Sequence, residues 1–376
     1  MKQLIKYCWC ILLVGGFASC VKESTPVRSG SIAISAGSQL ACEVGGRPEI
    51  TVDLVLLGTL SKPRAGTAIA AAGNKIVVAG GLWTSDCPEC WGSSRADIFD
   101  ISTNSWTTAE LSAGRWSVEA VTAGNRIFFA GGQFGDGAFD IYYDNVDIFD
   151  ATAKTWTVKH LSEPRGFLAA GTLGDKVFFA GGEKNWNYDN SAVVDIYDLS
   201  SDTFSSFNLS APRAHISAVA AGKKIYFAGG EGHNRMYQNP SDVIDIFDNS
   251  ANTWSLSKLS VPMSLTTGTT MGDSIYWGAG CDIEIKDVTT GISSIARPYK
   301  TAAWFVKAVT KDKLILFLGG TRGPLTHSVK ENKFDIYNTT TKTWHVGILP
   351  ITIECAVSYK NNVYVADRTK LYRLKF

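Results

Sequence analysis

Short apolar runs recur along the chain, and most of them end in a pair of glycines. Four copies are closely similar: KIVVAGG ending at Gly81, RIFFAGG at Gly132, KVFFAGG at Gly182 and KIYFAGG at Gly230. Two weaker copies follow, SIYWGAG ending at Gly280 and LILFLGG at Gly320, and the related run NVYVADR near the C-terminus lacks the glycines. Because the copies recur about every 50 residues, they predict a structural unit that is repeated seven times.

Each repeat contains further patterned segments around its Gly-Gly run. An alternating run such as GTAIAAAGN precedes it, and a variable loop followed by a second signature such as ADIFDISTNSW comes after it. In five copies an aromatic residue precedes a Trp or Phe by seven positions: Phe99 to Trp106, Phe149 to Trp156, Tyr197 to Phe204, Phe247 to Trp254 and Tyr337 to Trp344. The pattern predicts four short strands in each repeat and no helix.

Gly-Gly, a downstream Tyr or Phe, and a Trp at this spacing resemble the kelch repeat, from about residue 50 to the C-terminus. The resemblance implies an all-β fold, a kelch-type β-propeller of seven four-stranded blades, with six blades as the alternative. The glycines and the Trp series are expected to be structural, for close backbone packing and for contacts between blades. The last copy has three strands, so we expect the N-terminal strand in EITVDLVLLGTLSKPR to close the last blade.

The N-terminus has the layout of a secretory signal, with Lys2 and Lys6 before the apolar run CWCILLVGGFA. The stretch GFASC resembles a bacterial lipobox, which implies a lipoprotein signal peptide over 1–19 and a lipid on Cys20. A tether would then fill residues 20–49 and the propeller 50–376. A plain secretory signal is the alternative, because Phe17 replaces the usual aliphatic residue.

The lipobox and the charge balance together define the expected location and partners. No Asp follows Cys20, so the resemblance implies an exported outer-membrane lipoprotein, facing the periplasm or the cell surface, that contacts the membrane through its lipid anchor only. Lys and Arg number 36 against 35 Asp and Glu, which gives no electrostatic basis for a nucleic-acid partner. We expect a monomer.

Cys87 and Cys90 lie in the first variable loop, outside the repeat pattern. In an exported protein such a pair favours a local disulfide, with a metal site or functional thiols as alternatives. Zinc requires further ligands at matching spacing, which are lacking nearby, so no metal and no cofactor are expected. The sequence does not assign partners to Cys42, Cys281 and Cys355.

Two sets of loops are expected on one face of the propeller: the variable loops between strands two and three, and the links from strand four to the next blade. The fifth variable loop is nearly deleted at Gly280. Aromatic rings mixed with amides and carboxylates suit a glycan or an extended peptide, although long loops also bury their own aromatic residues. The predicted ligand-binding residues are Trp83, Trp91, Trp116, Tyr142, Tyr143, Trp186, Tyr188, His215, His233, Arg235 and Tyr237.

These features favour an envelope-anchored binding propeller that recognises a glycan or protein partner and catalyses no reaction. The alternative is a carbohydrate-active enzyme, for which bacterial kelch propellers acting as sialic-acid mutarotases are the nearest analogy. In that case Glu231, His233 and Arg235 would supply an acid–base pair and a carboxylate anchor. A structural scaffold for an envelope complex is a third hypothesis.

Overall fold

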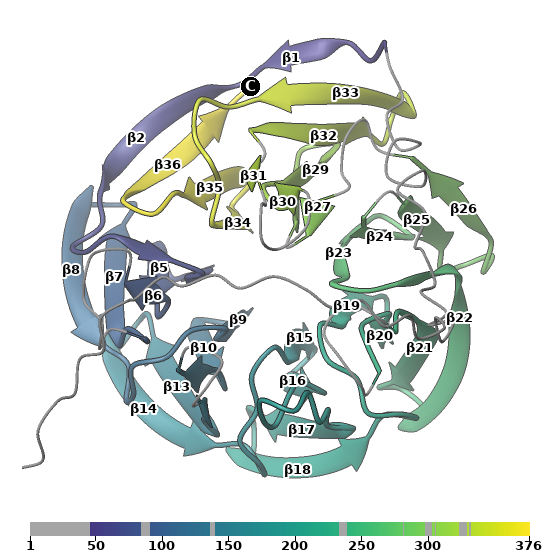
Figure 1. Ribbon diagram of the computed structural model, residues 1–376, viewed down its shortest axis with the longest axis horizontal. Helices are drawn as coiled ribbons and strands as arrows, with labels where there is room; N and C mark the ends of the chain where they lie inside the picture. Colours follow the sequence, from purple (N-terminus) through teal and green to yellow (C-terminus); the bar gives the residue numbers. More distant parts are fainter. Residues whose placement is uncertain are drawn as a thin grey trace, which may run out of the picture.

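The computed structural model describes residues 46–83, 91–135, 140–232, 239–280, 282–297, 303–304, 306–322, 329–330 and 332–376. Within these ranges the chain forms strands and turns, and seven sheets are arranged around a central axis as the blades of a propeller (Figure 1). The structure confirms the seven-bladed prediction, and the six-bladed alternative is wrong. The same ranges contain no apolar helix of membrane-spanning length.

Blades 1 to 5 are each built from four antiparallel strands that follow one another in the chain. Blade 1 contains β4 (Ala68–Ala72), β5 (Lys75–Ala79), β7 (Arg95–Asp100) and β8 (Ser105–Glu110). Blade 2 contains β9 (Glu119–Ala123), β10 (Arg126–Ala130), β13 (Asn145–Asp150) and β14 (Thr155–His160). Blade 3 contains β15 (Ala169–Leu173), β16 (Lys176–Ala180), β17 (Val193–Asp198) and β18 (Thr203–Asn208). Blade 4 contains β19 (Ser217–Ala221), β20 (Lys224–Ala228), β21 (Ser241–Asp248) and β22 (Thr253–Met263). Blade 5 contains β23 (Thr267–Met271), β24 (Ser274–Ala279), β25 (Asp282–Asp287) and β26 (Ser293–Ala296).

The last two blades both use strands from the N-terminal end of the propeller. Blade 6 contains β28 (Lys307–Lys311), β29 (Leu314–Leu318), β32 (Lys333–Asn338) and β33 (Thr343–Ile348), and β1 (Glu49–Thr51) pairs with β33 in parallel. Blade 7 contains β34 (Cys355–Tyr359), β35 (Asn362–Ala366) and β36 (Lys370–Lys375), and β2 (Asp53–Thr59) is its fourth strand. The predicted closure is confirmed, whereas the β1 pairing is an addition that the sequence pattern does not indicate. The N-terminal segment therefore covers the outer edge of two neighbouring blades (Figure 1).

Short strands on the loop face complete the structure. They are β3 (Arg64–Ala65) paired with β6 (Leu82–Trp83), β11 (Gln133–Phe134) with β12 (Ile141–Tyr142), and β30 (Thr321–Arg322) with both β27 (Ala303–Trp304) and β31 (Val329–Lys330).

The recurring aromatic pairs pack between neighbouring blades, as predicted. Phe99 lies opposite Trp106 in the β7–β8 register, with ring centroids 5.1 Å apart. The Trp106 indole also donates a hydrogen bond across the blade interface to the Leu57 carbonyl of blade 7, at 3.2 Å. At the interface between blades 3 and 4, the Phe207 ring stacks on the Trp254 ring, with ring centroids 4.7 Å apart. These rings join the blades by burying large apolar surfaces.

The Gly-Gly pairs are structural as well. Gly181 has φ +62° and Gly182 has φ +105°, conformations that residues with a side chain rarely adopt. A Cβ atom on Gly181 would lie 2.3 Å from the Arg213 carbonyl oxygen in the adjoining link. Glycine is therefore required where the second strand of one blade meets the link to the next.

A buried ion pair, which the sequence analysis did not predict, joins each of the first four blades to the link before it. Arg165 in the link to blade 3 pairs with Asp195 on β17, and their side chains are 0% and 2% exposed. Arg165 also donates hydrogen bonds to the carbonyls of Gly181 at 2.7 Å and Val193 at 2.8 Å. The equivalent pairs are Arg64 with Asp97, Arg115 with Asp147, and Arg213 with Asp245.

The later blades depart from this ion-pair pattern. In blade 5 the link position holds Met263, and the buried carboxylate is Glu284. In blade 6 the residue at the position of the link arginine is Ala303. The backbone of the next residue, Trp304, pairs with Thr321 directly after Gly-Gly, just as Ala214, the residue after Arg213, pairs with Glu231 in blade 4. There Arg47 from the N-terminal segment pairs with Asp335 at 3.0 Å and lies over the Trp344 ring at 4.9 Å. The N-terminal segment thus supplies the guanidinium that the link of blade 6 lacks.

Candidate functional site

The residue directly after each Gly-Gly pair lies on the loop face, beside the link that leads into the same blade. Gln133, Glu183 and Glu231 hold this position in blades 2, 3 and 4, and they are only 3%, 4% and 3% exposed. Their backbones bridge to Trp116, Gly166 and Ala214 in the links, which confirms that loops and links share one face. We call the region formed by these three positions, their links and the paired loop residues Tyr142 and Asn190 the mouth.

The links add a second set of side chains to the mouth. The residue two positions after the link arginine has a positive φ in three successive links: Ser117 at 50°, Phe167 at 51° and His215 at 54°. The Phe167 ring lies 4.5 Å from the His215 ring and 5.5 Å from the Trp116 ring. A left-handed backbone conformation, unusual for residues with a side chain, thus recurs at these three link positions, next to the contacts between the Trp116, Phe167 and His215 rings.

Several buried polar atoms of the mouth have no hydrogen-bond partner among the described residues. They are Trp116 Nε1, Ser117 Oγ, Gln133 Oε1 and Asn190 Oδ1. The Cβ position built on Gly166 is 3.0 Å from Ser117 Oγ, 3.3 Å from Tyr142 Cε1 and 3.4 Å from Gln133 Oε1. Side chains from both sets therefore converge on one point. Buried polar groups are almost always paired in folded proteins, so this group of atoms marks a place that water or a ligand fills.

Ionisable groups of the mouth have strongly perturbed pKa values. Burial raises the pKa of Glu183 to about 8, and the negative charge of Glu231 adds to the effect. Tyr142 donates a hydrogen bond to Glu183 Oε2 at 3.5 Å, and burial raises the tyrosine pKa as well. Burial lowers the pKa of His215 to about 3. Both shifts disfavour charge on the His215 imidazole and on the Glu183 carboxyl group at neutral pH.

The predicted site residues lie in different parts of the loop face. Trp116, Tyr142 and His215, which were predicted to bind a ligand, lie in the mouth, as does Glu231, the catalytic candidate of the enzyme alternative. Trp186 is 58% exposed. Half-buried positions are held by Trp91, Tyr143 and Tyr188, and the backbone of Trp83 pairs with that of Arg64 in β3. His233, Arg235 and Tyr237 lie outside the described residues, as do Cys20, Cys87 and Cys90.

Five residues of the mouth were missed by the sequence analysis: Ser117, Gln133, Phe167, Glu183 and Asn190. A signal was available for four of them. They occupy fixed repeat positions, either directly after Gly-Gly or two residues after the link arginine, where the side chain varies from blade to blade. Variable side chains at an invariant backbone position are typical of a site built on a scaffold.

Neither metal binding nor thiol chemistry is indicated within the described part of the chain. These residues contain no group of three His, Cys, Asp or Glu side chains arranged to hold a metal ion. Cys355 is a free, buried thiol, 3.3 Å from Thr67 Oγ1, and burial raises its pKa to about 11. Cys42 and Cys281 lie outside the described residues.

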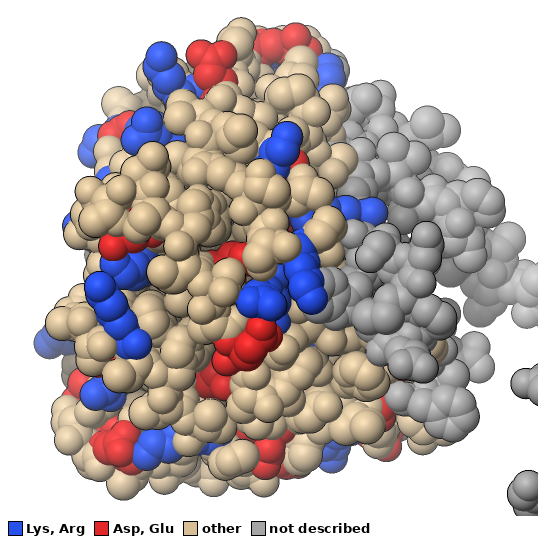
Figure 2. Space-filling view, turned by 90° about the vertical axis from the view of Figure 1, so that its left-hand side faces the viewer, with Lys and Arg blue, Asp and Glu red and all other residues tan. Residues whose placement is uncertain are grey.

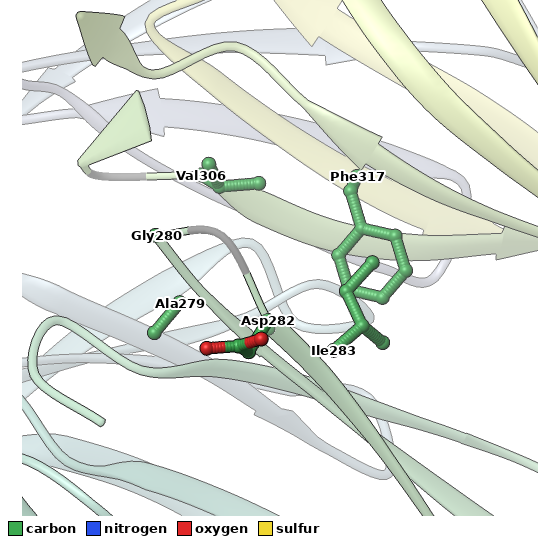
Figure 3. Close-up of a pocket in the computed structure, with 7 residues that line it drawn as sticks. Ala279, Gly280, Asp282, Ile283, Val306 and Phe317 are labelled. Atoms are coloured by element: carbon green, nitrogen blue, oxygen red, sulfur yellow. The ribbon is translucent and has the colours of Figure 1, made fainter. Parts of the chain in front are cut away.

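Blade 5 differs from its neighbours at the loop face, as predicted from its short loop. Two residues separate β24 from β25. A cavity of about 10 Å³ lies beside this turn, lined by Gly278, Val306 and Phe317 among others (Figure 3). Since that volume accommodates about one water molecule, the cavity is not a ligand site.

Charges are mixed on the side of the propeller that faces the viewer in Figure 2. Basic and acidic side chains lie interspersed on the face that Figure 2 shows, with no extended field of one sign. Such a surface does not steer a strongly charged polymer toward the protein.

The fold, the repeated Gly-Gly turns and the polar mouth define a kelch-type β-propeller. The family model of the KLHDC2/KLHL20/DRC7 kelch-repeats domain matches residues 66–280, more than half of the chain, and the chain belongs to this family of kelch-repeat domains. The solved structure described as "Structure of YjhT" is similar in fold, with a TM-score of 0.59 and 13% sequence identity over 78% of this chain and 99% of that chain. No curated protein matches the chain.

Proposed function

We propose that the protein binds a carbohydrate ligand at the mouth of blades 2 to 4 and catalyses no reaction there. The observation that carries this proposal is the group of buried polar atoms without a partner in the protein: Trp116 Nε1, Ser117 Oγ, Gln133 Oε1 and Asn190 Oδ1. They comprise one donor, one hydroxyl and two acceptors. This mixture complements a ligand rich in hydroxyl groups, because each hydroxyl both donates and accepts.

Aromatic rings around these atoms support the same ligand class. The rings of Trp116 and Phe167 are perpendicular to one another, and the Tyr142 ring lies near Gly166 in the same region. Sugars combine apolar C–H faces with polar edges, so rings beside hydrogen-bonding groups suit them. Trp186, which is 58% exposed, adds a ring for further units of an extended glycan.

A glycan microarray tests this proposal, with wild type beside Gln133→Leu and Trp186→Ala. Gln133→Leu removes one unpartnered acceptor, and we expect the signal to fall at least tenfold. Leu256→Ala is the matched control, since Leu256 is 65% exposed on β22 at the outer rim and should leave binding unchanged. Equal signals from all four proteins would contradict the proposal. If no glycan on the array gives a signal, but a protein partner binds wild type and not these two variants, a protein ligand at the same face is favoured.

An enzyme acting on a carbohydrate is the second candidate, favoured by the two carboxyl groups of Glu183 and Glu231 beside His215. A carboxyl group with a raised pKa, such as that of Glu183, can serve as a general acid. In this version His233 and Arg235 join Glu231, with Arg235 as carboxylate anchor. Mutarotation of sialic acid followed by NMR would test it. A rate that is the same with wild type, with Arg235→Ala and without protein would exclude this activity.

We also propose that the protein is an exported, monomeric lipoprotein, anchored in the outer membrane by a lipid on Cys20, and that Cys87 and Cys90 form a disulfide. β1 begins at Glu49 on the outer edge of blade 6, so a tether before it would join the propeller at the rim and leave the mouth accessible (Figure 1). Labelled palmitate should enter wild type and not Cys20→Ser. Intact mass after alkylation, with and without reductant, tests the disulfide.

A further inference from the structure

Two glutamates of the mouth flank a single imidazole. His215 Nδ1 lies 3.9 Å from Glu183 Oε1 and 3.6 Å from Glu231 Oε1. The three side chains are at most 6% exposed. On its other side, the imidazole packs against the Phe167 ring at 4.5 Å. Two carboxyl groups and one ring nitrogen thus share a small, buried region of the mouth.

The other ionisable groups near Glu183 are acidic too. Tyr142 directs its hydroxyl at Glu183 Oε2 from 3.5 Å, and Asp140 adds a negative charge from the same loop of blade 2. Among the described residues, no lysine or arginine nitrogen lies within 4.0 Å of the Glu183 carboxyl group. Two buried like charges repel strongly where solvent does not screen them. One of the two glutamates therefore has a strong physical reason to retain its proton.

We infer that Glu183 is a neutral carboxylic acid in the folded protein and that it donates a hydrogen bond to an acceptor oxygen of the bound ligand. The protonation stands on the geometry of the free protein. The ligand contact rests on the proposed carbohydrate binding, and it adds a donor to a mouth whose other unpartnered atoms are one donor, one hydroxyl and two acceptors. Ligands that place an acceptor oxygen beside the Glu183 carboxyl group are therefore favoured.

The direction of the pKa shift agrees with this geometry and makes the effect measurable. Burial and the charge of Glu231 raise the Glu183 pKa from 4.5 to about 8. Between these values the folded protein holds a proton that the unfolded chain releases. Stability contributed by this group is therefore fully present below pH 4.5 and is lost as the pH rises through 8.

Infrared difference spectroscopy on the full chain tests the protonation without any ligand. At pH 6, wild type minus Glu183→Gln should show the carbonyl band of a protonated carboxyl group, and the band should disappear by pH 10. Labelling glutamate with ¹³C should shift it. Glu110→Gln is the control, since the Glu110 side chain is 51% exposed and should give no such band. Absence of the band at pH 6 would overturn the inference.

The ligand contact is tested by reading the glycan array at pH 7 and pH 9. Wild-type signal should fall about tenfold as Glu183 ionises, given its raised pKa. Glu183→Gln keeps a neutral donor, so its signal should stay constant. Equal pH dependence of both proteins would refute the contact while leaving the infrared result intact. If no glycan binds at either pH, the proposed function is wrong, and the infrared band alone decides the protonation.

Discussion

Replacing Arg165 by methionine should destabilise the propeller without changing its surface. Arg165 is fully buried, and its guanidinium joins the Asp195 carboxylate to the carbonyls of Gly181 and Val193. Methionine is unbranched, reaches about as far as the arginine Nε and has no charge. The variant therefore leaves a carboxylate that is 2% exposed without its cation, and the Gly181 and Val193 carbonyls lose their hydrogen bonds from the guanidinium. The Val193 carbonyl keeps its bond from the Gly181 N–H at 2.9 Å.

The cost follows from the burial of this ion pair. Removing one partner of a buried pair costs about 3–5 kcal/mol, because the remaining charge is left desolvated. In a chain of this size such a loss lowers the melting temperature by about 5–10 °C. The chain contains its own counterpart, since Met263 holds the equivalent position before blade 5.

Urea and thermal unfolding of Arg165→Met, followed by circular dichroism, measure this cost. Lys258→Met is the control, because Lys258 pairs with Asp242 at 2.9 Å on the surface and is 75% exposed, so its loss should change little. Adding Asp195→Leu to Arg165→Met should recover much of the stability by removing the unpaired charge. If Arg165→Met unfolds at the wild-type urea concentration and temperature, the buried pair does not hold the link to the blade.

Three further predictions concern the turns, the N-terminal segment and the buried thiol. Gly181→Ala should destabilise the protein more than Gly174→Ala in urea unfolding. Both glycines have φ +62°, but a Cβ on Gly181 would lie 2.3 Å from a carbonyl oxygen, whereas one on Gly174 would have its nearest contact at 3.8 Å. Equal losses of stability would contradict the packing argument. Arg47→Ala should lower the melting temperature by leaving buried Asp335 without this cation, and a wild-type melting curve would show that the N-terminal arginine is dispensable. The Cys355 thiol should resist iodoacetamide at pH 8 in the folded protein and react after unfolding, as followed by peptide mass spectrometry, because burial raises its pKa to about 11; rapid labelling of the folded protein would refute this.

The repeat pattern was sufficient to predict the blades because it is set by backbone packing. Gly-Gly and the Phe99 to Trp106 spacing each satisfy a local steric requirement, and the same requirement recurs in successive blades. Closure by β2 followed from counting strands. The β1 pairing could not be predicted in this way, because it depends on Arg47 reaching Asp335 from a distant part of the chain.

The mouth was predicted only in part, because the prediction was based on aromatic side chains in the loops and did not include the polar residues at fixed repeat positions. Trp116, Tyr142 and His215 were identified as loop aromatics and do lie there. Glu183 and Gln133 follow Gly-Gly directly and looked like the start of a variable loop. Their burial depends on the link that leads into the same blade packing beside them, a contact between segments that no local pattern reveals.

A crystal structure of the protein soaked in a sugar that scores on the array tests the central claim most directly. The account predicts sugar density in the mouth, with hydroxyl groups bonded to Trp116 Nε1, Gln133 Oε1 and Asn190 Oδ1, the buried atoms that lack a partner in the described protein. Sugar bound elsewhere, with these atoms bonded to other parts of the protein, would contradict it.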